Sequence, residues 1–422
     1  MVQKQALELY LHIPFCVRKC RYCDFLSMSA QEDVRRKYVD RLLEEIMVQS
    51  RQCKRYQVVS VFVGGGTPSL LAGVQVWEIM EAVRSHFCLK EDAEITLECN
   101  PGTLTAEKLS FYQAAGINRL SLGLQSADNR ELRELGRIHT FEDFLESFDL
   151  ARKKGFHNIN IDLISSLPGQ LPQRWASTLK KVSGLLPEHI SAYSLIVEEG
   201  TPFYELYGDD EQRRQRGEEP RFLPSEEAER EMYNMTREIL AARGYRRYEI
   251  SNYALPHREC RHNIGYWRLV PYLGLGLGSS SFIENVRYSN TGNLSAYLGG
   301  EFRRLTEILE YADQQCEDGH KCAAGKNQEL LHQQEQTMYY LHKRQQMEEF
   351  MFLGMRMMEG VSRDKFRDKF GIALEGIYGS VLNKLQQQGL IEQWEGMVRL
   401  TEEGIAVSNY VFSQFLDDSY SR

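Results

Sequence analysis

Apolar residues follow two alternating spacings over the first 195 residues of the chain. Short runs rich in Val, Ile and Leu are typical of buried strands, and they alternate with longer stretches in which apolar residues recur every three or four positions, as on one face of a helix. The expected strands cover Glu8–Phe15, Val58–Val63, Ala93–Cys99, Arg119–Gln125, Asn158–Ile164 and His189–Leu195. The expected helices cover Asp33–Gln49, Gly73–His86, Ala106–Ala115, Phe141–Lys154 and Pro172–Leu185.

This alternation of strand and helix, repeated six times, predicts an α/β fold built on a parallel sheet. Six units fit an incomplete, open β/α barrel better than the closed barrel of eight strands. We therefore expect an incomplete six-stranded parallel β/α barrel over residues 1–295. The charged stretch 208–219 is expected to be a solvated loop.

Residues 347–422 predict a second, smaller α+β module. Helical patterns cover Glu349–Arg356, Ser362–Phe370 and Leu374–Gln388, and residues 389–401 resemble a hairpin. Three helices and a hairpin resemble a winged helix, which in DNA-binding proteins uses a basic recognition helix. The third helical stretch holds only one Lys and one Glu, so we expect this module to pack against the mouth of the barrel instead.

The stretch between these two regions, residues 296–346, is polar and predicts an insertion or linker. Cys316, His320 and Cys322 lie within it at spacings that could bind a metal ion. A solvated segment with incidental thiols is the better interpretation of this composition.

Composition limits the partners and the compartment. The formal net charge is −8, which argues against a nucleic-acid surface because phosphate contacts need a basic face. The first strand begins within ten residues of Met1, and no apolar run approaches the length of a membrane span. Peripheral membrane contact stays open. Nine cysteines without disulfide-like regularity favour a reducing compartment, and we expect the cytoplasm.

Three of these cysteines, Cys16, Cys20 and Cys23, are spaced C-x3-C-x2-C directly after the first expected strand. One loop can turn three thiolates at this spacing toward a common centre. Three ligands on a cubane iron–sulfur cluster leave one iron open to a small molecule. A zinc loop or a redox pair is the alternative, but structural zinc needs a fourth ligand and usually has other spacings.

Glycine and polar residues follow several expected strands at the point where each strand ends. In β/α barrels this rim is where binding sites are built. Gly64 to Gly66 allow a backbone to approach a ligand closely. The polar rim residues are Glu98, Gln125, Arg137 and Asp162. Singly, each could cap a helix or fix a loop, but together beside the cysteines they predict a ligand site.

A zwitterionic ligand that carries a ribose needs the groups that this rim offers. Backbone oxygens suit an ammonium group, a cation suits a carboxylate, and carboxylates or amides suit ribose hydroxyls. Arg137 is the expected partner of the ligand carboxylate. Gln125 and Asp162 are the expected partners of the ribose.

Six segments occur in this order along the chain: HIPFCVRKCRYCDF, VGGGTP, LECNPG, GINRLSLGLQS, GRIH and NIDLISSLPGQ. They resemble the radical S-adenosylmethionine (SAM) superfamily, specifically its HemN and HemW branch, and the resemblance covers at least residues 9–290. It implies a 4Fe–4S cluster on Cys16, Cys20 and Cys23, with the amino and carboxylate groups of SAM on the open iron. It also implies that Tyr22 flanks the adenine. The further SAM contacts that it implies are Tyr10, Gly65, Gly66, Thr67, Glu98, Gln125, Arg137 and Asp162.

A later segment, Cys260–Trp267, contains the pattern HNxxYW. A lone His beside aromatic residues is more often a hydrogen-bonded core residue than a ligand. The pattern is also a hallmark of HemW proteins, and this resemblance implies haem as a further cofactor, with His262 as an iron ligand or against the porphyrin. His257 and Cys260 are close enough in sequence to replace His262 as the axial ligand.

Two functions of different classes fit this resemblance. The first is a haem carrier, a chaperone that binds haem and passes it to an acceptor protein which the sequence does not identify. The second is an enzyme, an oxygen-independent coproporphyrinogen III dehydrogenase, in which a radical derived from SAM abstracts substrate hydrogens.

Two sequence features separate the carrier from the enzyme. Dehydrogenases of the HemN type have a fourth cysteine, giving C-x3-C-x2-C-x-C, and a long segment ahead of the cluster. Here Phe25 occupies that fourth position, and only fifteen residues precede Cys16. With the HNxxYW pattern, these features favour the carrier, and no side chain is assigned a catalytic role.

Overall fold

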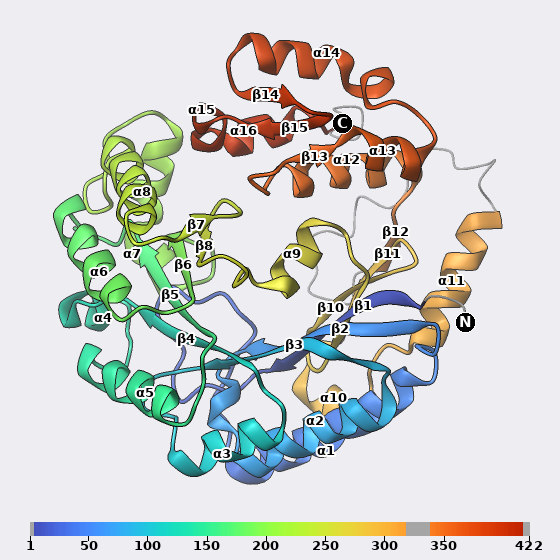
Figure 1. Cartoon of the computed structure of the whole chain (residues 1–422). Helices are drawn as coiled ribbons and strands as arrows, with labels where there is room; N and C mark the ends of the chain where they lie inside the picture. The colour runs from blue at the N-terminus through green and yellow to red at the C-terminus, as the bar shows by residue number, and fades with distance from the viewer. Residues whose placement is uncertain (1–3, 318–337, 417–422) are drawn as a thin grey trace.

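A twelve-stranded sheet forms the centre of the computed structural model, which describes residues 4–317 and 338–416. The strand order is β12-β11-β10-β9-β1-β2-β3-β4-β5-β6-β8-β7. Figure 1 shows the central strands following one another across a curved sheet, with helices along the outer side of the curve. The six parallel strands are β1 (Gln5–Ile13), β2 (Tyr56–Gly65), β3 (Leu89–Cys99), β4 (Arg119–Gln125), β5 (Ile159–Ser165) and β6 (His189–Ser194).

The barrel is open because its first and last parallel strands pair with other strands and not with each other. Strand β1 pairs in parallel with β9 (Tyr272–Leu275), and β6 pairs antiparallel with β8 (Asn252–Ala254). The prediction of an incomplete six-stranded parallel β/α barrel is therefore confirmed. The remaining strands that extend the sheet are β7 (Arg246–Arg247), β10 (Ser280–Ile283), β11 (Val286–Ser289) and β12 (Met338–Tyr340).

The five predicted helices lie where the apolar spacing places them, and the short helix α4 was not predicted. Helix α2 and strand β4 coincide with their predicted ranges, and the ends of the other predicted elements of this region differ by at most four residues. The helices are α1 (Glu32–Ser50), α2 (Gly73–His86), α3 (Ala106–Ala114), α4 (Asn129–Glu134), α5 (Phe141–Lys153), α6 (Pro172–Gly184), α7 (Pro202–Gln215), α8 (Glu226–Ala241), α9 (Arg261–Trp267), α10 (Leu294–Leu298) and α11 (Leu305–Glu317), with the short 3-10 helix η1 (Pro68–Leu70).

Helix α7 overturns one expectation, because residues 208–215 were expected in a solvated loop. The helix begins with Thr201, whose side chain accepts a hydrogen bond from the backbone N–H of Tyr204, and with Pro202 in its first turn. Thr201 and Pro202 are standard start signals for a helix. The many charged residues of this segment suggested a loop, but they lie on the outer face of a helix whose buried side chains include Phe203 and Tyr207.

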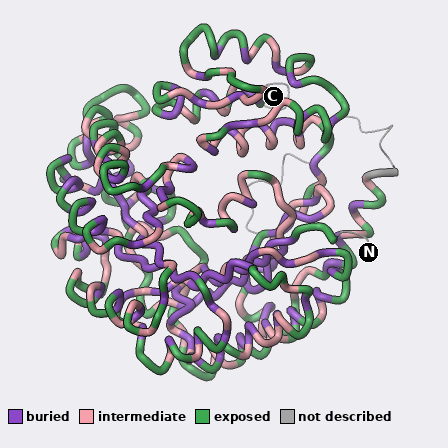
Figure 2. Tube along the Cα trace, viewed as in Figure 1, coloured by how far each residue is buried: buried purple, intermediate pink, exposed green. Residues whose placement is uncertain are grey.

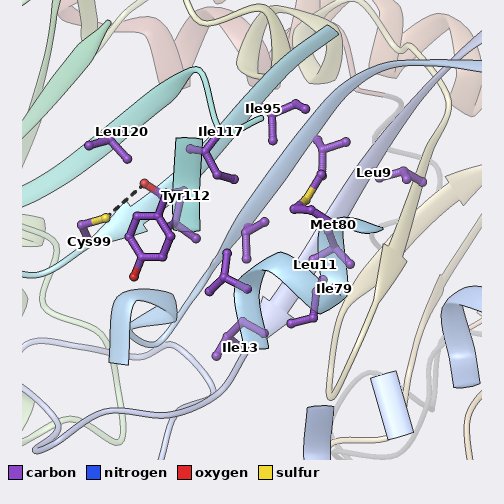
Figure 3. Packing of buried hydrophobic residues seen from close by; sticks show 14 of the residues in the cluster. Leu9, Leu11, Ile13, Ile79, Met80, Ile95, Cys99, Tyr112, Ile117 and Leu120 are labelled. Carbon is purple, nitrogen blue, oxygen red and sulfur yellow. Dashed lines mark hydrogen bonds between the residues drawn. The ribbon is translucent and has the colours of Figure 1, made fainter. Parts of the chain in front are cut away.

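Side chains of the barrel strands alternate between the helix layer and the barrel interior, as the strand geometry requires. The outward residues of β1 have no exposed area: Leu7, Leu9, Leu11 and Ile13. Figure 3 shows Leu11 and Ile13 close to Ile79 of α2 within the main core. The inward residues of β1 are Glu8, Tyr10 and His12. The interior of this barrel is therefore polar.

Helix α9 covers the end of the barrel interior at which the parallel strands begin. The Glu94 carboxylate accepts hydrogen bonds from the backbone N–H groups of Arg261 and His262, both at 3.1 Å. Ser60 Oγ lies 2.8 Å from Nδ1 of His262 and donates to Glu8 Oε1 at 3.0 Å. We call Glu8, Ser60, Glu94 and His262 the floor network.

Residues 343–416 form the second module around a core of their own. Figure 2 shows buried positions both in the barrel sheet and inside this module. The predicted helices and hairpin of a winged-helix-like module are present, with a three-stranded sheet in the order β13-β15-β14. The elements are α12 (Lys343–Gly354), β13 (Val361–Ser362), α13 (Arg363–Phe370), α14 (Leu374–Gln387), β14 (Ile391–Trp394), β15 (Met397–Leu400), α15 (Glu402–Ala406) and α16 (Ser408–Ser413).

The module packs on the floor side of the barrel, so the expectation that it packs against the mouth is wrong. Arg356 lies over the ring of Trp267 in α9, 4.4 Å from its centroid. Met358 N donates to Tyr248 O at 3.0 Å. Arg287 of β11 makes two hydrogen bonds to the carboxylate of Glu349, at 2.7 and 2.8 Å.

The described parts of residues 296–346 pack with the barrel. Leu305 and Ile308 of α11 belong to the main core, and β12 pairs with β11. Gln49 of α1 accepts from Leu305 N at 2.8 Å and fixes the start of α11. The metal-like residues of this stretch, Cys316, His320 and Cys322, have side chains outside the described part of the chain. The domain limits at 296 and 347 stay a prediction.

No helix within residues 4–317 and 338–416 combines the length and apolar content of a membrane-spanning segment.

The floor network makes stability depend on pH through Glu8. Burial raises the pKa of Glu8 to about 9, so the folded chain keeps a proton that the unfolded chain releases above its ordinary pKa of 4.5. This group therefore makes the wild type lose stability as pH rises from about 4.5 to 9, with a slope of up to about 1.4 kcal/mol per pH unit.

The Glu8→Gln variant has no proton to release and should become progressively more stable relative to wild type across this range. Urea unfolding of both proteins at pH 5, 7 and 8.5, roughly the window that the shifted pKa defines, measures the difference. A constant difference at the three pH values would contradict the protonated state of Glu8.

Candidate functional site

The three cysteines lie in the loop between β1 and α1, which the rest of the rim holds in place. Each thiol is half-buried. The loop folds back on itself, because Cys16 N donates to Met28 O at 2.9 Å and Met28 N donates to Pro14 O at 2.8 Å. Its middle is tied to the end of α4, where Arg21 N donates to Leu135 O at 3.1 Å. Backbone hydrogen bonds thus position the thiols before any ligand binds.

Two of the three sulfur atoms accept hydrogen bonds from predicted site residues. Thr67 Oγ1 donates to Cys16 Sγ at 3.5 Å, and Arg137 Nη1 donates to Cys20 Sγ at 3.6 Å. A donor or a cation beside sulfur favours the thiolate, which is the form that binds iron. Burial raises the pKa of Cys23, whereas a bound metal would favour its thiolate.

Asn100 joins these two donors and was not predicted as a site residue. Its Nδ2 donates to Thr67 Oγ1 at 2.8 Å, and its Oδ1 accepts from Arg137 Nη2 at 2.8 Å. Arg137 Nη2 also donates to Gly123 O at 2.7 Å. One side chain therefore fixes both groups that donate to the cysteine sulfurs. Its place directly after β3, one of the rim positions, is the signal that could have identified it.

The donor set of this loop fits a cluster. Three thiols converge from one loop and two of them receive hydrogen bonds at sulfur, as cluster ligands commonly do. Among the described residues, no three His, Cys, Asp or Glu side chains are grouped as ligands of a single metal ion. The thiolates of a cubane bind different irons, so a cluster does not require the close grouping that ligands of a single ion have.

The glycine turn after β2 lies directly against the cysteine loop. Gly65 has φ +111°, and a Cβ there would lie 2.5 Å from the ring of His12. A Cβ on Gly66 would lie 2.8 Å from Phe15 O. Gly65 N donates to Glu98 Oε2 at 3.0 Å. Both glycines are therefore required by close packing, and they bring the turn next to the thiols and to a rim carboxylate.

Glu98 and Asp162 face the same part of the barrel interior. Burial, and then repulsion from Asp162, raises the pKa of Glu98 to about 8. Glu98 therefore holds a proton near neutral pH, and a cationic ligand would favour its release. Asp162 is oriented by Ser121 Oγ, which donates at 2.9 Å, and by Asn160 Nδ2, which donates at 2.8 Å.

Gln125 ends β4 with φ +74°, a backbone conformation that is uncommon for residues other than glycine. The pairing of β4 with β5 shifts register between Gly123 and Gln125. Such an irregularity re-aims a side chain at the end of a strand, and strained residues of this kind collect at binding sites. This conformation supports the prediction that Gln125 contacts a ligand.

The two predicted tyrosines lie in different surroundings. Tyr10 faces the interior, with its hydroxyl 3.0 Å from Nδ1 of His12. Tyr22 lies on the cysteine loop and packs against Phe203 of α7, with 6.4 Å between ring centroids. Tyr22 also lies near Arg137, whose positive charge acts on its hydroxyl.

His262 is not part of this rim. It is 1% exposed in the floor network, and its second ring nitrogen, Nε2, lies 2.9 Å from the Tyr266 hydroxyl. Burial lowers the pKa of His262 to about 3, so the ring is neutral. Both ring nitrogens are hydrogen-bonded in this conformation, and a role as haem ligand requires the floor network to open. The sequence did not reveal its partners Ser60 and Glu94, because neither belongs to a recognisable motif.

Two family models match the chain. The model described as the radical SAM superfamily matches residues 10–182, and the model of the HemN C-terminal domain matches residues 341–407. The first match contains the cysteine loop and the rim residues described above. It implies a 4Fe–4S cluster and SAM as cofactors.

Several curated relatives match most of the chain. A Bacillus subtilis protein named heme chaperone HemW is 34% identical over 410 residues, which cover 97% of this chain and 99% of the relative. The Escherichia coli protein of the same name is 35% identical over 319 residues, covering 74% of this chain and 81% of the relative.

Among solved structures, coproporphyrinogen III oxidase (HemN) from Escherichia coli, described as a radical SAM enzyme, matches with a TM-score of 0.75. At 22% identity, this alignment covers 98% of the chain and 90% of HemN, and it shows the shared fold. The identity to the Bacillus subtilis relative extends over nearly the full length of both chains. The protein therefore belongs to the HemW family within the radical SAM superfamily.

Proposed function

We propose that this protein is a haem chaperone, which binds haem and transfers it to an acceptor protein, with a 4Fe–4S cluster and SAM as further cofactors. The observation that carries this proposal is the full-length identity of 34% to proteins named heme chaperone HemW. Phe25, at the position of the fourth cysteine of HemN-type dehydrogenases, supports it. The acceptor protein is not identified.

The second candidate is an oxygen-independent coproporphyrinogen III dehydrogenase. The fold shared with HemN favours it, but a fold by itself does not carry a function. One experiment separates the two functions. Anaerobically purified protein with reconstituted cluster is titrated with haem, and in parallel is given coproporphyrinogen, SAM and a reductant. We expect saturable haem binding and no decarboxylated product, whereas product without haem binding would contradict the chaperone function.

In this proposal the residues of the rim hold the two cofactors. Cys16, Cys20 and Cys23 would hold the cluster, and the turn at Gly65, Gly66 and Thr67, which lies against the cysteine loop, would contact SAM. When bound, the cluster and SAM supply one-electron chemistry. The chain itself positions the ligand.

Each polar rim residue has a proposed partner on SAM. Arg137 pairs with the carboxylate, because its guanidinium already lies beside Cys20. Gln125 and Asp162 accept hydrogen bonds from the ribose hydroxyls. The further contacts are Tyr10, Tyr22 and Glu98.

We also propose that the protein works in the cytoplasm. The seven cysteines with described side chains are all free thiols, and an exposed cluster loop of this kind needs a reducing surrounding.

Each loop cysteine should be required for the cluster. Changing Cys16, Cys20 or Cys23 to Ser removes one thiolate ligand, so the reconstituted protein should lose most of its iron and its brown colour. Iron content per chain measures the effect. Cys88→Ser is the matched control, because Cys88 is an exposed free thiol outside the loop. Wild-type iron content in a loop variant would favour the zinc or redox interpretation.

Arg137→Ala should weaken SAM binding while the cluster is retained. Loss of a buried charge-assisted contact costs about 1.5 to 3 kcal/mol, or roughly ten- to hundredfold in affinity. Calorimetry on anaerobic protein measures the dissociation constant. Arg133→Ala, an exposed change in the same helix region, is the control and should bind SAM as wild type does. Equal affinity in all three proteins would remove Arg137 from the site.

Asn100→Ala should shift the midpoint potential of the cluster to a more negative value. Without Asn100, Thr67 and Arg137 lose the side chain that directs them to the sulfurs, and hydrogen bonds to cluster sulfurs raise the potential. Redox titration followed by electron paramagnetic resonance gives the potential. Asn100→Asp keeps the acceptor for Arg137 but adds a negative charge, which also lowers the potential, so it should not return the potential to the wild-type value. An unchanged potential with Ala would show that Asn100 does not act through the sulfurs.

A further inference from the structure

A cleft of about 620 Å³ lies between the edge of the barrel and the C-terminal module. Its barrel side comes from α8 and from the segment around β7, and its module side comes from β14, β15 and α15. We call it the arginine cleft, because it is lined by four arginines and two glutamates among its charged residues: Arg237, Arg246, Arg247, Arg399, Glu392 and Glu402.

The charge of this cleft is opposite to that of the chain. The protein carries a formal net charge of −8, whereas four guanidinium groups in the cleft face two carboxylates. Excess positive charge in a concave site attracts anions. The cleft is therefore a candidate for binding an anionic ligand.

The two glutamates leave part of this positive charge uncompensated. Glu402 is shared, because it accepts two hydrogen bonds from Arg247 at 2.8 and 2.9 Å and pairs with Arg237 at 2.8 Å. Glu392 pairs with Arg399 at 2.7 Å. The side chain of Arg246 makes no hydrogen bond or ion pair with any residue in the described ranges. Two positive charges thus have no carboxylate of their own.

The four arginines differ in burial: one side chain is buried, and the other three are exposed enough to contact a ligand. The Arg247 side chain is 6% exposed, and it also donates to Met358 Sδ at 3.2 Å and to the Tyr233 hydroxyl at 3.3 Å. These contacts fix its position, so Arg247 forms part of the lining and does not move to meet a ligand. The side chains of Arg237 and Arg399 are 37% exposed and Arg246 is exposed, so these three can reach a ligand.

We propose that the arginine cleft binds haem through its two propionate groups. This inference rests on the proposed chaperone function and names a site for its ligand. A carboxylate pairs well with a planar guanidinium, and two propionates match the two uncompensated charges. The cleft volume lies within the usual range for sites of cofactor-sized ligands. The apolar lining residues Leu400 and Ile405 are each 6% exposed, so the propionates, and not the faces of the macrocycle, supply the proposed contacts.

This site also gives the HNxxYW helix a part in haem binding without a bond from His262 to iron. Tyr248 follows Arg247 in the chain, and its hydroxyl accepts from Cys260 N at 3.3 Å at the start of α9. Met358, which lines the cleft, donates its backbone N–H to Tyr248 O. Helix α9, which we call the floor helix, therefore helps to fix the position of Tyr248, next to Arg247 in the lining of the cleft.

Charge reversal in the cleft tests the proposal. The variant Arg246→Glu/Arg399→Glu should weaken haem binding at least tenfold in a Soret titration of the full chain with reconstituted cluster, while its iron content and SAM affinity match wild type. The control Arg51→Glu/Arg130→Glu changes the net charge equally at exposed arginines outside the cleft and should bind haem as wild type does. Haem dimethyl ester, which lacks free propionates, should bind wild type as weakly as haem binds the reversed variant.

Several results would overturn the site. Equal haem affinity in wild type, reversed variant and control would do so, as would tight binding of the dimethyl ester. Loss of haem binding in His262→Ala, with the reversed variant unaffected, would move the site to the floor helix. If circular dichroism shows that the double variant does not fold, the haem affinity of the single variant Arg246→Glu tests the site instead. The Arg246 side chain has no hydrogen bond or ion pair to lose in the described structure. Absence of saturable haem binding in wild type would instead overturn the chaperone function itself.

Discussion

The alternation of side chains along the parallel strands is the constraint on which the rest of this structure depends. On β1, leucine and isoleucine point to the helices while Glu8, Tyr10 and His12 point inward. The inner surface is thus free to carry polar groups, provided that each finds a partner. Near the carboxyl ends of the strands those partners are ligands or rim residues, and near the amino ends they are supplied by α9.

The same constraint explains which parts of the fold could be predicted from sequence. The ends of strand β4 and helix α2 were predicted to the residue. Their apolar spacing is unbroken, and turn residues flank both elements. The strands β9 to β12 have three or four residues each, too few for a period to show. Helix α7 carries many charges on its exposed face, and the sequence did not show that Phe203 and Tyr207 face inward.

The candidate site was predictable to the extent that it follows strand ends and motif spacing. Arg137 and Thr67 lie beside Cys20 and Cys16 in the structure, and their contacts with SAM stay a prediction. Asn100 was missed as a site residue although it lies in the segment LECNPG, because its importance comes from two hydrogen bonds to residues of different loops. The burial of His262 could not be derived either, because it depends on Ser60 and Glu94, which come from distant parts of the sequence.

The distribution of the thiols has a practical consequence for handling the protein. Burial raises the pKa of Cys53 and of Cys260 to about 12, and both side chains are enclosed in the core. Among the described cysteines, an alkylating reagent would therefore reach the three loop thiols and the exposed Cys88. A cluster on the loop thiols, as proposed above, would shield them from the reagent, so mass spectrometry of labelled peptides would report the fraction of chains that carry it without any colour measurement.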